Sequence, residues 1–179
     1  EYTDIFDAAE VNFDERRELA QTIAGAMGRR ADQLIVDALS AGSTISHGST
    51  GLTVAKITSA AKTLNDNGVP MDDRILLTSA AGIEDLLNEE KATSADYATV
   101  RALMSGELNT FMGFNIVMME TRAEGGLTLA STTRDCFAFH KSSIGCAIGL
   151  DISTEVNYIP EKTSWLSLGK YKAGAVTID

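Results

Sequence analysis

The chain has 179 residues, of which 44% are hydrophobic, and this suits one compact domain or two small lobes that share a core. Its 25 acidic residues outnumber its 15 basic ones, and the net charge of -10 argues against a surface that reads nucleic acid. No apolar run approaches the roughly 20 residues of a membrane span, and 2 cysteines exclude a disulfide framework. We expect both thiols, Cys136 and Cys146, to be reduced and buried.

The first predicted element is a long helix over residues 14–40. Apolar residues such as Leu19, Ile23, Met27 and Leu34 recur at helical spacing, with acidic residues in the first turn. Roughly 27 residues at about 1.5 Å each give a helix of roughly 40 Å. Because a compact chain of this size has a radius of gyration of about 16 Å, this helix would cross the whole molecule.

Shorter elements follow the long helix. Further helices are predicted from the same periodicity, over residues 52–67, 83–89 and 94–105. Strands are predicted where apolar runs meet turn residues, over residues 74–78, 115–120 and 128–130. From residue 135 onward the chain is strand-like, and the alternation over residues 152–158 predicts a half-buried strand. Helices that come mainly first and strands that come mainly last favour an α+β fold over a doubly wound parallel sheet.

Residues 68–87, GVPMDDRILLTSAAGIEDLL, combine a strand, a turn of small residues and a helix. Several enzyme families use this arrangement to present a nucleophile or to bind a phosphate. A nucleophile elbow needs glycine two positions before and after the serine, but Leu77 and Ala81 occupy those positions around Ser79. The phosphate-loop and dinucleotide-binding glycine patterns are also absent from the sequence. We therefore interpret Ser79 as a helix cap.

Residues that could carry catalysis or bind a metal are scarce. His47 and His140 are the only histidines, so a serine hydrolase would have to combine one of them with Ser79 or Ser49. Neither histidine has a sequence neighbour that would activate it, and the histidines and cysteines lack metal-ligand spacing. The acidic pairs are interpreted as solvated faces, and they are Asp72–Asp73, Glu84–Asp85 and Glu89–Glu90. We predict no catalytic, cofactor-binding or metal-binding residues.

The order of five stretches carries a resemblance to a known family. Residues 13–40 resemble a long spine helix, and residues 52–87 resemble a second helix, a "GVP…R" connection and the strand and helix that open an axial domain. Residues 104–120, MSGELNTFMGFNIVMME, resemble a "G.l....Gf.i" segment, and residues 137–156 and 169–179 resemble closing strands. Together they resemble tailed-phage major capsid proteins with the fold named after phage HK97.

This resemblance implies an α+β, HK97-like capsid fold. Residues 1–70 and 151–179 would form a peripheral domain of spine helix and β-sheet, and residues 71–150 an α/β axial domain. The family's N-terminal arm and extended loop have no counterpart in this sequence, which opens at Glu1 without a methionine. We therefore expect residues upstream of Glu1 to be missing, and the isolated chain to be monomeric.

The resemblance also implies a function as a major capsid protein that is not an enzyme and needs no cofactor. Copies would assemble as pentamers and hexamers into an icosahedral shell, with or without a scaffolding protein. The shell would enclose double-stranded DNA without sequence-specific binding, and it would form in the host cytoplasm and end in the virion. The alternatives are an encapsulin-like shell, which stores cargo, and the small serine hydrolase considered above. Basic residues are secondary candidates for subunit contacts and are otherwise solvated charges: Arg16, Arg17, Arg101, Arg134 and Lys141.

Overall fold

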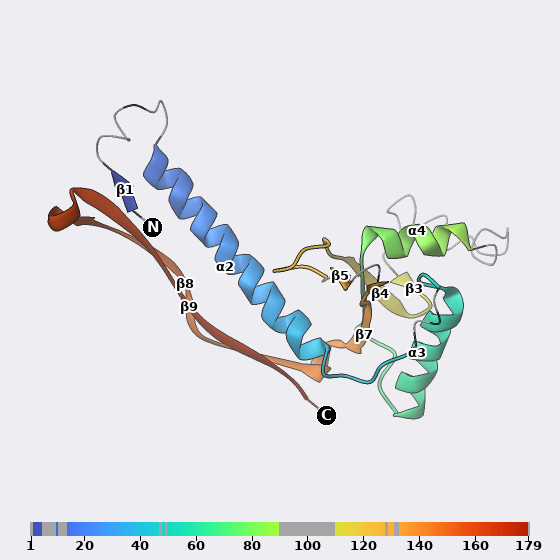
Figure 1. Cartoon of the computed structure of the whole chain (residues 1–179). Coiled ribbons are helices and arrows are strands. Elements are labelled where there is room, and N and C mark those ends of the chain that lie inside the picture. Colours follow the sequence, from blue (N-terminus) through green and yellow to red (C-terminus); the bar gives the residue numbers. More distant parts are fainter. Residues whose placement is uncertain are drawn as a thin grey trace.

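The computed structural model describes residues 2–4, 10, 14–46, 48, 50–89, 110–127, 129–130 and 133–178. Within these residues the chain forms two lobes (Figure 1). One lobe is long and narrow and holds a helix beside a β-hairpin, and the other holds two helices and a four-stranded sheet. The helix predicted over residues 94–105 lies outside the described residues.

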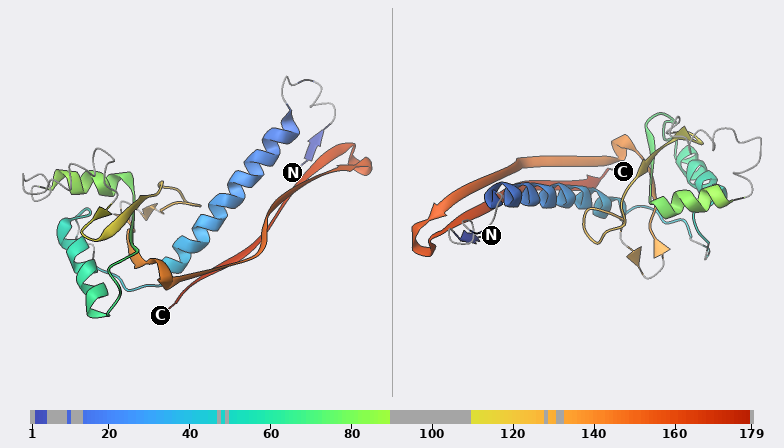
Figure 2. Two further views of the ribbon diagram at one scale, coloured as in Figure 1. Left: turned by 180° about the vertical axis from the view of Figure 1, so that it is seen from behind. Right: turned by 90° about the horizontal axis from the view of Figure 1, so that it is seen from above.

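The first lobe is built on helix α2, Glu15–Leu39, which lies along the hairpin of β8, Ile144–Ile159, and β9, Ser164–Thr177 (Figure 2). The 25 residues of α2 span about 37 Å, which confirms the predicted long helix. Glu15 and Glu18 lie in its first turn, where they complement the positive end of the helix dipole.

Helix α2 lies close to β9. A Cβ atom added at Gly169 would overlap the side chains of Met27 and Ile23, so this glycine lets the helix approach the strand. A third strand, β1, Tyr2–Asp4, pairs antiparallel with β9 and gives the order β1-β9-β8. A short 3-10 helix, Pro160–Lys162, turns the hairpin at its tip. Strand β8 therefore lies at one edge of this sheet.

The second lobe holds a sheet in the order β3-β4-β2-β7. Its strands are β2, Arg74–Thr78, β3, Thr110–Phe111, β4, Phe114–Met118, and β7, Phe137–His140. Strand β2 pairs parallel with β4 and antiparallel with β7. The helices of this lobe are α3, Val54–Asp66, and α4, Ala80–Asn88. The small elements β5, Leu129–Ala130, β6, Thr133–Arg134, and a 3-10 helix, Lys141–Ser143, complete the described part.

The two helices of the second lobe share one apolar core with its sheet. The buried members of this core come from α3, β2, α4, β3 and β4, and they are Val54, Ile57, Leu76, Leu86, Phe111 and Phe114. Helix α4 also holds the start of α3, because the Asp85 carboxylate accepts the Leu52 amide at 3.3 Å and the Glu89 carboxylate accepts the Val54 amide at 2.6 Å. These two acidic residues are therefore caps, not only solvated charges as their sequence suggested.

A second apolar cluster joins the two lobes. Val36 and Leu39 of α2 pack with Leu77 of β2 and with Leu127, and all four side chains are buried. Phe137 and Phe139 of β7 pack against the same cluster. The C-terminal end of α2 is therefore anchored to the second lobe.

The predicted strand over residues 74–78 has the bounds of β2, and the strand-like character after residue 135 is confirmed by β7, β8 and β9. Residues 152–158 do form part of a strand, but the prediction that this strand is half-buried is wrong, because all seven residues are exposed. In the described part of the chain, α2 is the helix that covers this sheet, and it lies close to β9. It contacts β8 as well, along one face of that strand, but the side chains of residues 152–158 remain exposed.

Candidate assembly surfaces

Ser79 is the N-cap of α4, as predicted. Its hydroxyl accepts a hydrogen bond from the Gly82 amide at 3.3 Å, and the residue is 2% exposed. A Cβ atom at Gly82 would overlap Thr78 Oγ1, so the glycine allows the tight turn between β2 and α4. A buried hydroxyl that satisfies the helix terminus is not placed to attack a substrate.

His140 lies at the opposite end of β2 from Ser79. It pairs with Arg74 in the sheet, and Ser79 is five positions further along, about 16 Å away at strand spacing. His140 Nδ1 accepts the Ser142 amide at 3.2 Å. The structure therefore does not bring Ser79 and His140 together as a catalytic pair, while His47 and Ser49 lie outside the described residues.

The thiols and acidic residues form no metal centre in the part of the chain that the structure describes, where no group of three or more His, Cys, Asp or Glu could hold an ion. Cys136 is half-buried, with its sulfur 3.3 Å from Thr78 Oγ1. Cys146 is exposed on β8, so the expectation that both thiols are buried is wrong for this residue. The edge position of β8 explains the difference.

Among the described helices, none is long and apolar enough to cross a membrane.

A shallow hollow of about 470 Å³ opens beside the start of β2. Most residues that line it are exposed, but Arg74 is buried. The lining residues are Met71, Asp72, Asp73, Arg74, Thr110, Met112, Gly113 and Asn115. The Arg74 guanidinium donates to the carbonyl oxygens of Pro70 and Val69 and to Asn65 Oδ1. This cation therefore holds the α3–β2 connection in place and is not free to recognise a ligand.

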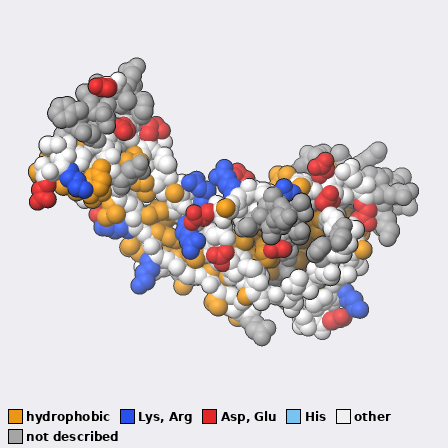
Figure 3. Space-filling model, viewed as in Figure 1, with side chains coloured by type: hydrophobic (Ala, Val, Ile, Leu, Met, Phe, Trp, Pro, Cys, Tyr) orange, Lys and Arg blue, Asp and Glu red, His pale blue; other side chains and the backbone are white. Residues whose placement is uncertain are grey.

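The largest group of exposed apolar side chains lies on the hairpin (Figure 3). Its members on β8 and β9 are Ile148, Leu150, Ile152, Val156, Tyr158, Leu168 and Val176. Leu168 is 42% exposed and, because neighbouring residues of a strand alternate, it faces away from α2, opposite to Gly169. Leu150 pairs with Lys172 and lies on the same outer face. By the same pairing, Val156 lies opposite Ser167 and Tyr158 lies opposite Trp165, so these two side chains are on the other face of the hairpin, the one that carries α2. Exposed apolar side chains therefore occur on both faces of the hairpin, where they are candidates for contacts with other molecules.

The outer edge of β8 adds backbone groups to this surface. No described strand pairs with that edge, which runs for the 16 residues of the strand. Proteins protect a long edge with lysine, proline or β-bulges. Strand β8 contains neither lysine nor proline, its only charged residues are Asp151 and Glu155, and its pairing is irregular between residues 148 and 153. By contrast, Lys170 and Lys172 lie on β9, and Lys170 Nζ contacts Glu155 at 2.7 Å. We refer to the exposed apolar side chains on β8 and β9, together with the edge of β8, as the hairpin surface.

The basic residues considered as subunit contacts have diverse settings. Arg16 lies 4.9 Å from the centre of the Trp165 ring, so it helps to hold the start of α2 on the hairpin. Arg17 and Lys141 are exposed and Arg134 is half-buried, while Arg101 lies outside the described residues. None of the described residues among them marks an interface as clearly as the exposed apolar side chains of the hairpin do.

A family model described as "phage capsid protein" matches residues 1–179. The chain belongs to the phage capsid protein family. A chain from a solved structure of Mycobacterium phage Che8 is 22% identical, with a TM-score of 0.71, and the match covers 99% of this chain and 64% of that one. A chain from the capsid structure of cyanophage P-SCSP1u is 14% identical, with a TM-score of 0.63 and coverage of 99% and 67%. Among curated proteins, none matches this chain.

These likenesses confirm the α+β capsid fold that the order of segments predicted. This member of the capsid family spans about two thirds of the length of each solved chain, 64% and 67%. Its family implies a place in a multi-subunit shell of the virion and a structural role. Among the described residues, the hairpin surface holds the largest group of exposed apolar side chains, a feature that sequence reasoning missed. The absence of lysine and proline from residues 144–159 is the signal that could have found it.

Proposed function

We propose that this protein is a major capsid protein whose copies build the icosahedral head of a tailed, double-stranded DNA phage or prophage. The family match over the whole chain supports this proposal, and the observation that carries it further is the exposed hairpin surface. A lone chain that leaves this much apolar area in water gains free energy when a neighbour covers it. The hairpin surface is therefore proposed as a contact between subunits.

The finer features of the shell follow from the same proposal. Copies would form pentamers and hexamers that assemble in the host cytoplasm, with or without a scaffolding protein. The net charge of -10 supports a subunit that encloses DNA without gripping it. We propose no enzymatic role, and the use of Ser79 as a helix cap supports this. Many weak contacts of this kind, closed by symmetry, are sufficient for a stable shell.

We also propose a division into a peripheral and an axial domain, with different bounds from those expected from the sequence. A boundary at residue 70 would separate α3 from the core that it shares with α4 and β2. A boundary at residue 150 would cut β8. We therefore assign β1, α2, β8 and β9 to the peripheral domain, and the segment from α3 to β7 to the axial domain.

The proposal is tested by placing charges on the hairpin surface of the complete gene product. Leu150 and Leu168 are both exposed on the outer face, so the double variant Leu150→Asp/Leu168→Asp should fold with an unchanged melting temperature. We expect it to form no capsomers or shells in negative-stain images and sedimentation runs. The matched control is Met71→Asp, an exposed apolar residue of the other lobe, which should assemble normally. If the double variant assembled with the same yield as the Met71→Asp control, the proposal that the hairpin surface is a contact between subunits would be wrong.

A further inference from the structure

A loop that leaves the second lobe reaches across to α2. It comprises residues 119–127 and is called the seam loop here. The Leu127 amide donates to the Glu120 carbonyl at 2.9 Å and closes the loop, and the Met119 amide donates to the carbonyl of Thr78 in β2 at 2.9 Å. Its far end meets the middle of α2. The seam loop is therefore a direct bridge between the two lobes.

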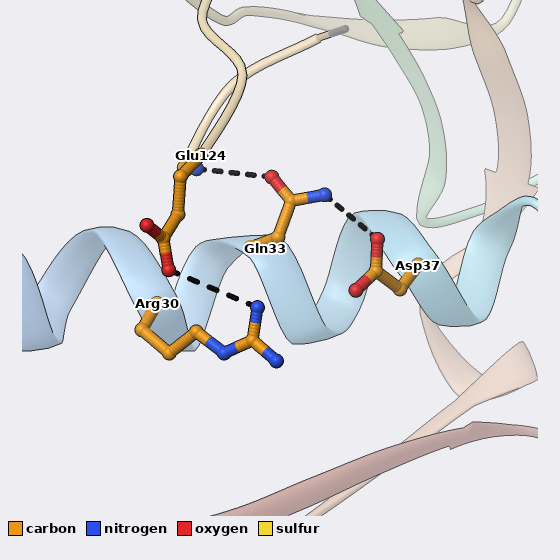
Figure 4. Close-up of polar contacts among 5 residues, drawn as sticks. Arg30, Gln33, Asp37 and Glu124 are labelled. Carbon is orange, nitrogen blue, oxygen red and sulfur yellow. Dashed lines mark hydrogen bonds and ion pairs between the residues drawn. The ribbon is translucent and has the colours of Figure 1, made fainter.

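The polar part of this bridge is centred on Gln33 of α2 (Figure 4). Its Oε1 accepts the Gly125 amide at 3.0 Å, and its Nε2 donates to Asp37 Oδ1 at 2.7 Å. The second bond fixes which way the amide group points, so the acceptor faces the loop. Gln33 is 7% exposed, and a buried amide with both ends satisfied has a single favourable orientation. Glu124 and Arg30 add an exposed ion pair at 3.8 Å, which contributes little.

Gly125 brings the loop backbone against the helix backbone. An added Cβ atom would lie 2.7 Å from Arg29 Cα and 2.8 Å from the Arg29 carbonyl oxygen. These are backbone atoms, so neither can move aside as a flexible side chain would. The φ angle of +74° also favours glycine. Both observations require glycine at the point where the loop touches α2.

An apolar layer lies beneath the polar contacts. Leu127 closes the seam loop and is 1% exposed, and it packs with Val36 and Leu39 of α2 and with Leu77 of β2. The polar bridge thus lies above the cluster that joins the lobes. Polar groups fix the direction of the contact, while the apolar layer holds the two sides together.

We propose that the seam loop is a clamp that sets the orientation of the two lobes, with Gln33 and Gly125 as its positioning residues. This rests on the proposed function, because a shell subunit must present its hairpin surface and its second lobe to neighbours at one fixed angle. Helix α2 alone is about 37 Å long, so a rotation of about 3° moves its far end by about 2 Å. Apolar contacts end beyond about 4.5 Å, so a shift of this size removes many of them.

The test compares pairs of variants that differ only in whether they touch the clamp. Gly125→Ala is matched by Gly68→Ala, because Gly68 has a similar φ of +70° but nothing within 4 Å of an added Cβ. Both variants bear the same backbone cost, and only the first meets α2. Gln33→Leu removes the acceptor for the Gly125 amide and is matched by Gln21→Leu, an exposed position on the same helix.

The readout is the distance between the lobes, measured by double electron–electron resonance on the complete gene product. Spin labels at Glu18→Cys on α2 and Lys62→Cys on α3 occupy exposed positions. The background carries Cys136→Ala and Cys146→Ser, which remove the two thiols of this chain. This distance does not depend on assembly, so the clamp is tested even if the protein forms no shell. Capsomer yield is measured separately by sedimentation.

We expect one narrow distance distribution for the parent, Gly68→Ala and Gln21→Leu. Gly125→Ala and Gln33→Leu should shift or broaden it by about 2 Å or more and should lower capsomer yield at least tenfold, with the circular dichroism of the folded state retained. Unchanged distances in both clamp variants would overturn the inference. A shifted distance with full capsomer yield would overturn the claim that this orientation matters for assembly. Failure of the parent itself to form capsomers would count against the proposed function alone.

Discussion

Replacement of Leu127 by alanine should destabilise the protein more than any change on the hairpin surface. The side chain is 1% exposed within the cluster that joins the lobes. The change removes three carbon groups, and at about 0.8 kcal/mol for each buried group the lost transfer free energy is about 2.4 kcal/mol. The cavity left behind adds to this, so we expect a loss of about 3 kcal/mol in the free energy of unfolding.

Chemical and thermal denaturation measure this loss. For a chain of this size, about 2–4 °C per kcal/mol gives a fall of roughly 6–12 °C in melting temperature. The matched control is Leu168→Ala, which makes the same change at a residue that is 42% exposed, and it should stay within about 0.5 kcal/mol of the parent. Equal and small losses in both variants would refute the reasoning, because Leu127 would then not occupy a tightly packed core.

Two further changes test the local geometry around β2. Ser79→Ala removes the cap of α4 and should cost about 1 kcal/mol in urea denaturation, since the Gly82 amide loses its acceptor; a variant as stable as the parent would contradict the assignment as a cap. Arg74→Met keeps the length of the side chain but removes the donors to Pro70, Val69 and Asn65, so it should cost about 2 kcal/mol by the same assay. Arg74→Lys should recover less than half of that loss, because one ammonium cannot reproduce the fork of the guanidinium; full recovery would show that only the charge matters.

Much of the fold could be predicted from local patterns. The spacing of apolar residues predicted α2, and Ser79 was recognised as a cap because the glycines of a nucleophile elbow are missing. The burial of β8 could not be predicted in the same way. Its alternation is that of a strand with one covered face, but the side chains of residues 152–158 stay exposed even though α2 contacts one face of the strand. The pattern is consistent with a strand that a neighbouring subunit covers, which a single chain does not provide.

The contacts between the lobes were also beyond sequence patterns. Gly125 and Gln33 are 92 positions apart, and neither belongs to a motif. The same holds for Asp85 and Glu89, whose sequence suggests solvated charges and whose carboxylates cap the start of α3. Such roles depend on which segments the topology brings together. They can be assigned only from the three-dimensional structure, which shows which segments are in contact.

A cryo-electron microscopy reconstruction of particles formed by the complete gene product tests the central claim most directly. The account predicts that density of a neighbouring subunit covers the outer face of β8 and β9, over Leu150 and Leu168. It also predicts that each subunit in the shell keeps α2 and the second lobe joined through the seam loop. A shell in which that face of the hairpin lies open to solvent would contradict the account.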